Sequence, residues 1–109
     1  ARLYQTYLPG VDWSGEAERF AAARWYAQLH VFRYPFYYID YALAETGAMQ
    51  LGMLDAADHE DCMQRYMELC RLGGTKSVTA LFDGAGLRSP FEAETMRDLM
   101  AHAAEVLGL

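Results

Sequence analysis

Pro35 stands at the start of an apolar run, residues 34 to 54, that is long enough to cross a membrane. Proline lacks a backbone N–H and disfavours the helical conformation in the residue before it. We therefore expect the chain to break near residues 33 and 34, with Pro35 as the first residue of a helix that extends to about Leu54. Asp40 and Glu45 lie within this run, and a charge near the middle of a bilayer costs about 2.5–3.5 kcal/mol. The run is therefore predicted to be a helix buried on most of its faces, rather than a membrane span.

Helical spacing of apolar residues recurs in the rest of the sequence, and no segment shows the period-two alternation of a strand. Ser14 is predicted to cap a helix that includes Phe20 and Trp25. Asp55 and Asp58 are predicted to form the junction before the next helix. That helix is expected to end at Gly73-Gly74 and to bury a stripe made of Cys62, Tyr66, Leu69 and Cys70.

Two further helices are expected towards the end of the chain. The first is short, from about Ser77 to Asp83. The second follows "SPFE", residues 89–92, which has the pattern of a capping box with Pro90 in the first helical position. Its predicted buried face consists of Phe91, Met96, Leu99, Met100, Ala103 and Leu107. The sequence therefore predicts an all-α fold of four or five helices, with residues 1–109 as a single helical segment.

Composition excludes some classes of partner. The chain has 109 residues and a net charge of −6, and its nine lysines and arginines are scattered. Because a phosphate backbone or an anionic membrane attracts clustered positive charge, we expect no nucleic-acid partner and no membrane partner.

Cys62 and Cys70 are predicted to be free thiols. On one helix, eight residues separate their Cα atoms by about 12 Å, whereas a disulfide allows about 7 Å. Buried free thiols and the absence of a visible signal peptide favour a cytoplasmic location. The chain also begins without Met, which suggests a processed product or a fragment.

The segment "HEDC", residues 59–62, is the one candidate metal site. It places His59 and Cys62 one helical turn apart, with two acidic residues between them. Acidic residues are expected in the first turn of a helix in any case, and zinc needs three or four converging ligands. We therefore interpret this segment as a solvated helix start and predict no metal ligand in the chain.

Tyrosines are concentrated in "YPFYYIDY", residues 34–41. Tyr38 and Tyr41 are three residues apart and share a helix face, and Tyr34 lies four residues before Tyr38. A tyrosine hydroxyl is neutral near pH 7 and can donate a hydrogen bond without carrying a charge. Core aromatic rings with wet tips would have the same spacing, so spacing alone leaves a core helix and a functional site both open.

The order of several motifs is specific in combination. "HVFRYPFYYIDYALAETGAMQL" is followed by "YMELCRLGGTKS" and "LFDGAGLRSPF", and then by a final amphipathic helix. Over residues 20–107 this order resembles the C-terminal segment of the oligoendopeptidase F-type enzymes, which are thimet oligopeptidase-like zinc metallopeptidases. The resemblance implies a larger helical peptidase that hydrolyses short peptides, with zinc bound by an H-E-x-x-H motif upstream of this segment.

The same resemblance implies roles for individual residues. His30, Tyr38 and Tyr41 match family residues that bind substrate and stabilise the oxyanion of the tetrahedral intermediate. Tyr37 and Tyr34 fall in the matching run as substrate-binding residues. Since H-E-x-x-H is absent from these 109 residues, the chain alone is predicted to be inactive and to bind no zinc.

Two partners besides peptides are expected. One is the upstream part of the same protein, and the other is a second copy, because exposed apolar surface favours self-association. The alternative function is that of a stand-alone helical module that binds peptides without cleaving them.

Overall fold

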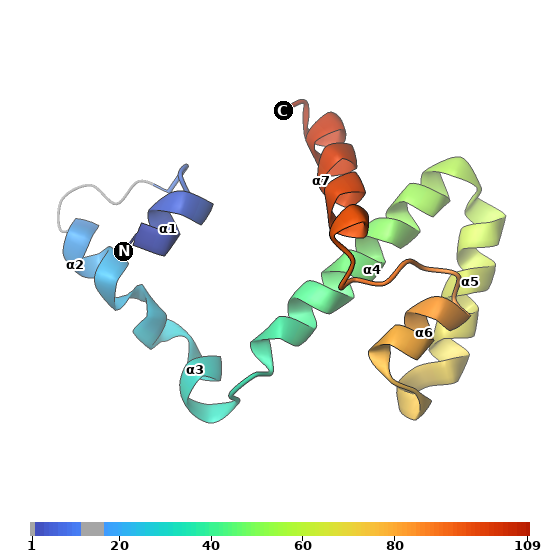
Figure 1. Ribbon diagram of the computed structural model, residues 1–109, viewed down its shortest axis with the longest axis horizontal. Coiled ribbons are helices and arrows are strands. Elements are labelled where there is room, and N and C mark those ends of the chain that lie inside the picture. The colour runs from blue at the N-terminus through green and yellow to red at the C-terminus, as the bar shows by residue number, and fades with distance from the viewer. Residues whose placement is uncertain (1, 12–16) are drawn as a thin grey trace. The chain divides into compact units, whose positions relative to one another are not determined.

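The computed structural model describes residues 2–11 and 17–109 of the chain (Figure 1). Its α-helices are α1 Arg2–Tyr7, α2 Ala17–Ala23, α3 Leu29–Arg33, α4 Tyr38–Ala57, α5 His59–Leu72, α6 Val78–Gly84 and α7 Ala93–Leu107. Two 3₁₀-helices, η1 Arg24–Ala27 and η2 Gly73–Thr75, lie between them. No described residue lies in a strand, and five described α-helices have seven or more residues. The predicted all-α class is therefore confirmed.

The chain divides into two compact units, residues 1–39 and residues 40–109. The first contains α1, which the sequence did not predict, together with α2, η1 and α3. The predicted cap Ser14 lies outside the described residues. The ring of Trp25 in η1 stacks on that of Phe32 in α3, with centroids 5.7 Å apart. This contact sets the position of α3 against η1.

The turn between α3 and α4 differs from the prediction that a helix begins at Pro35. Tyr34 ends α3, Tyr37 N–H donates to the carbonyl of Tyr34 over 3.2 Å, and α4 begins only at Tyr38. The cause is Phe36, whose φ of 68° belongs to the left-handed region. A right-handed helix cannot include that conformation, so Pro35 lies in a turn.

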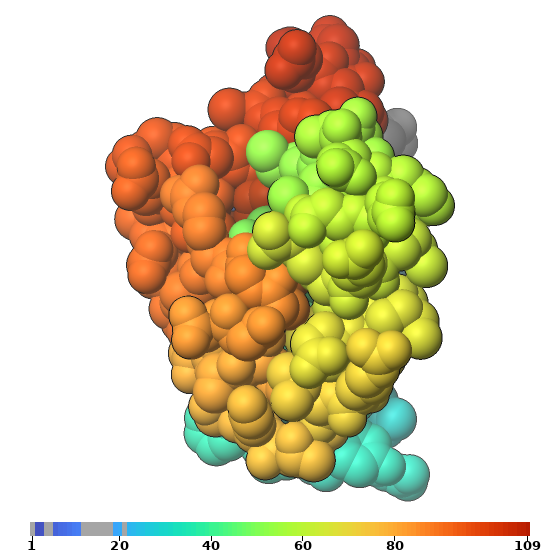
Figure 2. Space-filling model, turned by 90° about the vertical axis from the view of Figure 1, so that its right-hand side faces the viewer, coloured from blue at the N-terminus to red at the C-terminus, as the bar shows by residue number. Residues whose placement is uncertain are grey.

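The core of the second unit lies between α4, α5, α6 and the loop that precedes α7. Phe82, Ala85 and Leu87 are buried together, and three leucines pack around them, namely Leu51, Leu54 and Leu69. The ring of Phe82 approaches Gly47 of α4 so closely that a methyl group at Gly47 would lie 3.1 Å from it. Figure 2 shows α6, in orange, beside the yellow turns of α5 on one face.

Helix α4 is less buried than predicted. Among its described residues only Thr46, Gly47 and Gln50 are buried, and the helix continues to Ala57 rather than ending near Leu54. Asp55 therefore lies inside α4 and does not form part of the junction. The prediction of a helix buried on most faces is wrong, because the elements packed against α4 cover only the stripe that includes these three residues.

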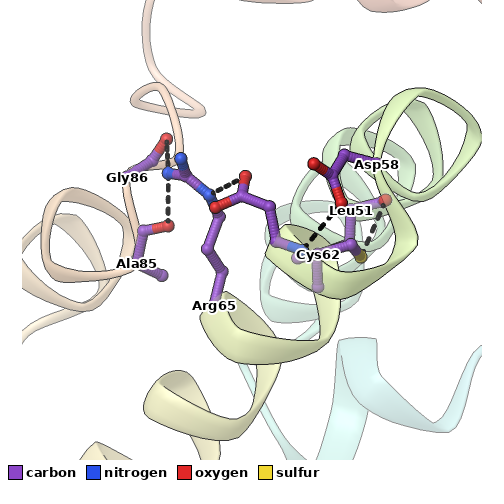
Figure 3. Close-up of polar contacts among 7 residues, drawn as sticks. Leu51, Asp58, Cys62, Arg65, Ala85 and Gly86 are labelled. Atoms are coloured by element: carbon purple, nitrogen blue, oxygen red, sulfur yellow. Dashed lines mark hydrogen bonds and ion pairs between the residues drawn. The ribbon is translucent and has the colours of Figure 1, made fainter.

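Helix α5 begins as the acidic residues predict. The Asp58 side chain accepts a hydrogen bond from Asp61 N–H over 3.1 Å, which is an N-cap. Cys62 is buried and its thiol donates to the Leu51 carbonyl over 3.3 Å (Figure 3). Both cysteines are free, as predicted, but Cys70 is exposed. The predicted buried stripe is therefore wrong at Cys70 and also at Tyr66, which is exposed.

The loop between α6 and α7 is held by two side chains. Gln50 donates to the Arg88 carbonyl over 3.0 Å and accepts from Arg88 N–H over 2.8 Å. Arg65 forms an ion pair with Asp61 at 2.7 Å and directs its guanidinium towards the carbonyls of Ala85 and Gly86 (Figure 3). These backbone groups are thereby satisfied by side chains rather than by a helix or a sheet.

The start of α7 corrects a further prediction. Ser89 accepts a hydrogen bond from Phe91 N–H over 3.3 Å, α7 begins at Ala93, and the side chain of Glu92 makes no cap. "SPFE" therefore forms a turn and not a capping box. Leu99 of α7 is buried at 2% exposure, whereas Leu107 at its end and Phe91 in the preceding turn are 70% and 65% exposed. The predicted buried face is too wide because only the stripe that includes Thr95 and Leu99 is covered.

In the described part of the chain, every helix is too short or too polar to cross a lipid bilayer.

Gly86→Ala is expected to lower the free energy of unfolding by about 1–3 kcal/mol. Gly86 has a φ of 66°, and a methyl group there would collide with the Arg65 guanidinium. The matched control is Gly52→Ala, since Gly52 lies within α4 with open space around it, and alanine is favoured over glycine in a helix by about 0.5–1 kcal/mol. Chemical denaturation measures both. Equal effects of the two substitutions would contradict the left-handed backbone of Gly86.

Cys70 is expected to react with a thiol reagent such as Ellman's reagent faster than Cys62. Burial raises the pKa of the Cys62 thiol, and the negative charges of Asp55 and Asp61 raise it further. At a given pH, less of the reactive thiolate therefore forms at Cys62. Cys62→Ala and Cys70→Ala assign the two phases. A fast phase that is lost in Cys62→Ala would show that α5 does not pack as described.

Candidate functional site: the His30 cluster

Four of the five predicted site residues come together at the turn between α3 and α4. His30 lies in the first turn of α3, Tyr34 follows the end of α3, Tyr37 lies in the turn, and Tyr38 begins α4. We call these four residues the His30 cluster. Tyr34 N–H donates to the His30 carbonyl over 3.2 Å. The chain thus reverses within a few residues and brings the start of α3 close to the start of α4.

The imidazole of His30 lies against three tyrosine rings. Its centroid is 4.9 Å from that of Tyr38, with 27° between the planes, which is a stacked arrangement. Tyr37 and Tyr34 lie at 5.9 and 6.3 Å from the same imidazole. Tyr34 also meets Tyr37 edge-on, with centroids 6.4 Å apart. Aromatic rings prefer stacked and edge-on contacts, so the tyrosines define the orientation of His30.

The His30 cluster is open to solvent on one side. His30 is half-buried, whereas Tyr34, Tyr37 and Tyr38 are exposed at about half of their surface, 52%, 48% and 56%. Apolar side chains of the same unit are exposed to the same extent, Ile39 and Phe32 both at 57%, so the exposure leaves both a core helix and a site open. An imidazole and several phenols on one face can hydrogen-bond a polar ligand while their rings provide apolar contact.

Tyr41, the fifth predicted site residue, belongs to the second unit. It lies in α4, three residues after Tyr38, and is 53% exposed. Residues three apart in a helix lie on neighbouring positions of one face. The catalytic roles expected for His30, Tyr38 and Tyr41, and the binding roles expected for Tyr34 and Tyr37, stay predictions.

Phe36 is a residue of this turn that sequence reasoning did not single out. It has a left-handed backbone and its side chain is 95% exposed. Because Phe36 follows Pro35, the sequence predicts a helical conformation for it. The one sequence feature that could have drawn attention to Phe36 is the density of aromatic residues around it. Tyr34 was a candidate from its spacing, and the structure now groups its ring with that of His30.

No zinc site forms among the residues that the structure describes. In residues 2–11 and 17–109, no group of three or more histidine, cysteine, aspartate or glutamate side chains converges to hold a metal ion. His59, the histidine of the "HEDC" segment, instead places Nδ1 2.6 Å from a carboxylate oxygen of Asp55.

A solved structure shares this helical arrangement. No protein-family model and no curated protein matches the sequence. The chain is similar to a crystallised protein named "putative Oligoendopeptidase F", with 33% sequence identity and a TM-score of 0.86. The match covers 98% of this chain and 19% of that protein. The chain therefore spans about a fifth of the length of the protein it resembles.

Proposed function

We propose that this chain is a segment of a zinc-dependent oligoendopeptidase, and that it supplies residues that bind peptide and stabilise the transition state. The observation on which this rests is the stacking of His30 on Tyr38, within an exposed group of tyrosines. The similarity of nearly the whole chain to part of a protein named as an oligoendopeptidase F supports the same proposal. Zinc, the cytoplasmic location and an upstream part of the protein that completes the site all belong to the proposal.

Each residue has a distinct task in this proposal. Tyr38 and Tyr41 donate hydrogen bonds to the oxygen that becomes negatively charged when the peptide carbonyl is attacked. His30 hydrogen-bonds the substrate, in an orientation set by the rings stacked around it. Tyr34 and Tyr37 contact the peptide through their rings and hydroxyls. A neutral phenol is suited to these tasks because it donates a hydrogen bond without a charge that must be desolvated.

Tyr38→Phe and Tyr41→Phe, made in the longer protein, are each expected to lower kcat by a factor on the order of 10²–10³. Each substitution removes one oxygen and keeps the ring, so the stacking of residue 38 on His30 is retained. Turnover of a quenched-fluorescent peptide measures the effect. The control is Tyr66→Phe, an exposed tyrosine on α5 outside the His30 cluster, which should leave kcat unchanged. An unchanged kcat in both Tyr38→Phe and Tyr41→Phe would exclude the proposed roles.

The alternative, a peptide-binding module without catalysis, is separated from this proposal by the upstream segment. The 109 residues alone are expected to show neither zinc nor turnover under both hypotheses. Only the peptidase hypothesis predicts that the longer protein contains zinc and cleaves the peptide. Metal analysis together with the same fluorescence assay distinguishes them.

A further inference from the structure

Helix α3 carries His30 but has little stability of its own. It consists of five residues, Leu29–Arg33, none of which is buried, and the Gln28 side chain makes no cap at its start. Isolated helices shorter than about 12–15 residues are marginal in water, so contacts with neighbouring elements are needed to hold α3 in place. The position of the His30 imidazole depends on those contacts.

One such contact joins α3 to η1. The rings of Trp25 and Phe32 lie 5.7 Å apart with 24° between their planes, which is a stacked arrangement. Gln28 N–H also donates to the Trp25 carbonyl over 3.0 Å, and Val31 N–H donates to the Gln28 carbonyl over 3.1 Å. The hydrogen bonds set the path of the chain, and the stacked rings, which extend outwards from it, limit the rotation of α3 about its own axis.

Phe32 and His30 lie on opposite sides of α3. They are two residues apart, which corresponds to about 200° around a helix with 3.6 residues per turn. Phe32 stacks on Trp25 on one side, and His30 stacks on Tyr38 on the other, with centroids 4.9 Å apart. All four residues belong to the first unit. The short helix is therefore held between two aromatic pairs, and loss of the first pair frees α3 to rotate and to displace the second.

We propose that Trp25 and Phe32 are positioning residues that hold the His30 imidazole where it contacts the substrate. This inference rests on the proposed function, which assigns His30 to substrate binding, and it adds the residues that fix the geometry of that contact. Both rings act through His30, so neither is a catalytic residue. A displacement of about 1 Å at a group that positions substrate can cost on the order of 10² in rate.

The test measures kcat/KM of the longer protein for a quenched-fluorescent peptide, with His30 present and with His30→Ala. Trp25→Leu and Phe32→Leu keep an apolar side chain and remove the ring, and each is expected to lower kcat/KM by a factor of about 10–100. In the His30→Ala background, the same substitutions should lower it further by less than about twofold, because residues that act as one unit are not additive. Trp25→Phe keeps a ring that can stack and should restore most of the activity.

Phe20→Leu is the matched control. Phe20 is an exposed phenylalanine of α2 in the same unit, and its substitution should change kcat/KM by the same factor with and without His30. The Tm of each variant measures folding separately. Trp25→Leu and Phe32→Leu remove the same stacked pair from its two sides, so the test stands on either variant if the other fails to fold.

Two outcomes would overturn the inference. The first is an unchanged kcat/KM in Trp25→Leu and Phe32→Leu. The second is an equal loss with and without His30, which would assign the stacked pair to stability alone. Failure of the proposed function looks different: His30→Ala by itself would leave kcat/KM unchanged, and the positioning role would fall with it. If His30→Ala reduces kcat/KM and the losses are additive, only the positioning role is excluded.

Discussion

The left-handed backbone of Phe36 determines where α4 begins, and the arrangement of the His30 cluster depends on it. Because Phe36 cannot be helical, α3 and α4 do not merge into one rod, and the chain reverses between Tyr34 and Tyr38. The reversal brings the imidazole of His30 to 4.9 Å from the ring of Tyr38. In a continuous helix the two residues would be eight positions apart, or about 12 Å along the axis.

Side chains that hold backbone groups stabilise the second unit. Gln50 makes two hydrogen bonds to the backbone of Arg88, and Arg65 lies against the carbonyls of Ala85 and Gly86. The loop before α7 has no regular secondary structure, so these contacts replace helix hydrogen bonds. The apolar core around Phe82 is small. The hydrogen bonds of Gln50 and Arg65 additionally fix the position of the loop before α7.

The sequence predicted the helical class and the approximate positions of the longer helices, because capping residues and glycines act locally. The sequence placed a junction at Asp58 and a helix start near Ser77, and in the structure these two residues cap α5 and α6. The sequence could not predict which side chains are buried. Periodicity shows which side chains share a helix face, but not whether another element covers that face. Leu107 and Cys70 have the spacing of core residues and are exposed.

The site shows the same division between local and tertiary information. Motif order alone indicated His30, Tyr38 and Tyr41, and spacing made Tyr34 a candidate. The meeting of His30 with Tyr34 and Tyr37 depends on the turn, which Pro35 predicted in the wrong place. A backbone conformation as unusual as that of Phe36 leaves no pattern in a single sequence, because phenylalanine is not a residue that favours positive φ.

The central claim is the proposal that His30, Tyr38 and Tyr41 bind the tetrahedral intermediate of peptide hydrolysis. A crystal structure of the longer protein with a phosphinic peptide, an analogue of that intermediate, tests it most directly. The account predicts that the hydroxyls of Tyr38 and Tyr41 lie within about 3 Å of the phosphinate oxygens, with His30 in contact with the peptide. A bound analogue with both hydroxyls directed away from it would contradict the account.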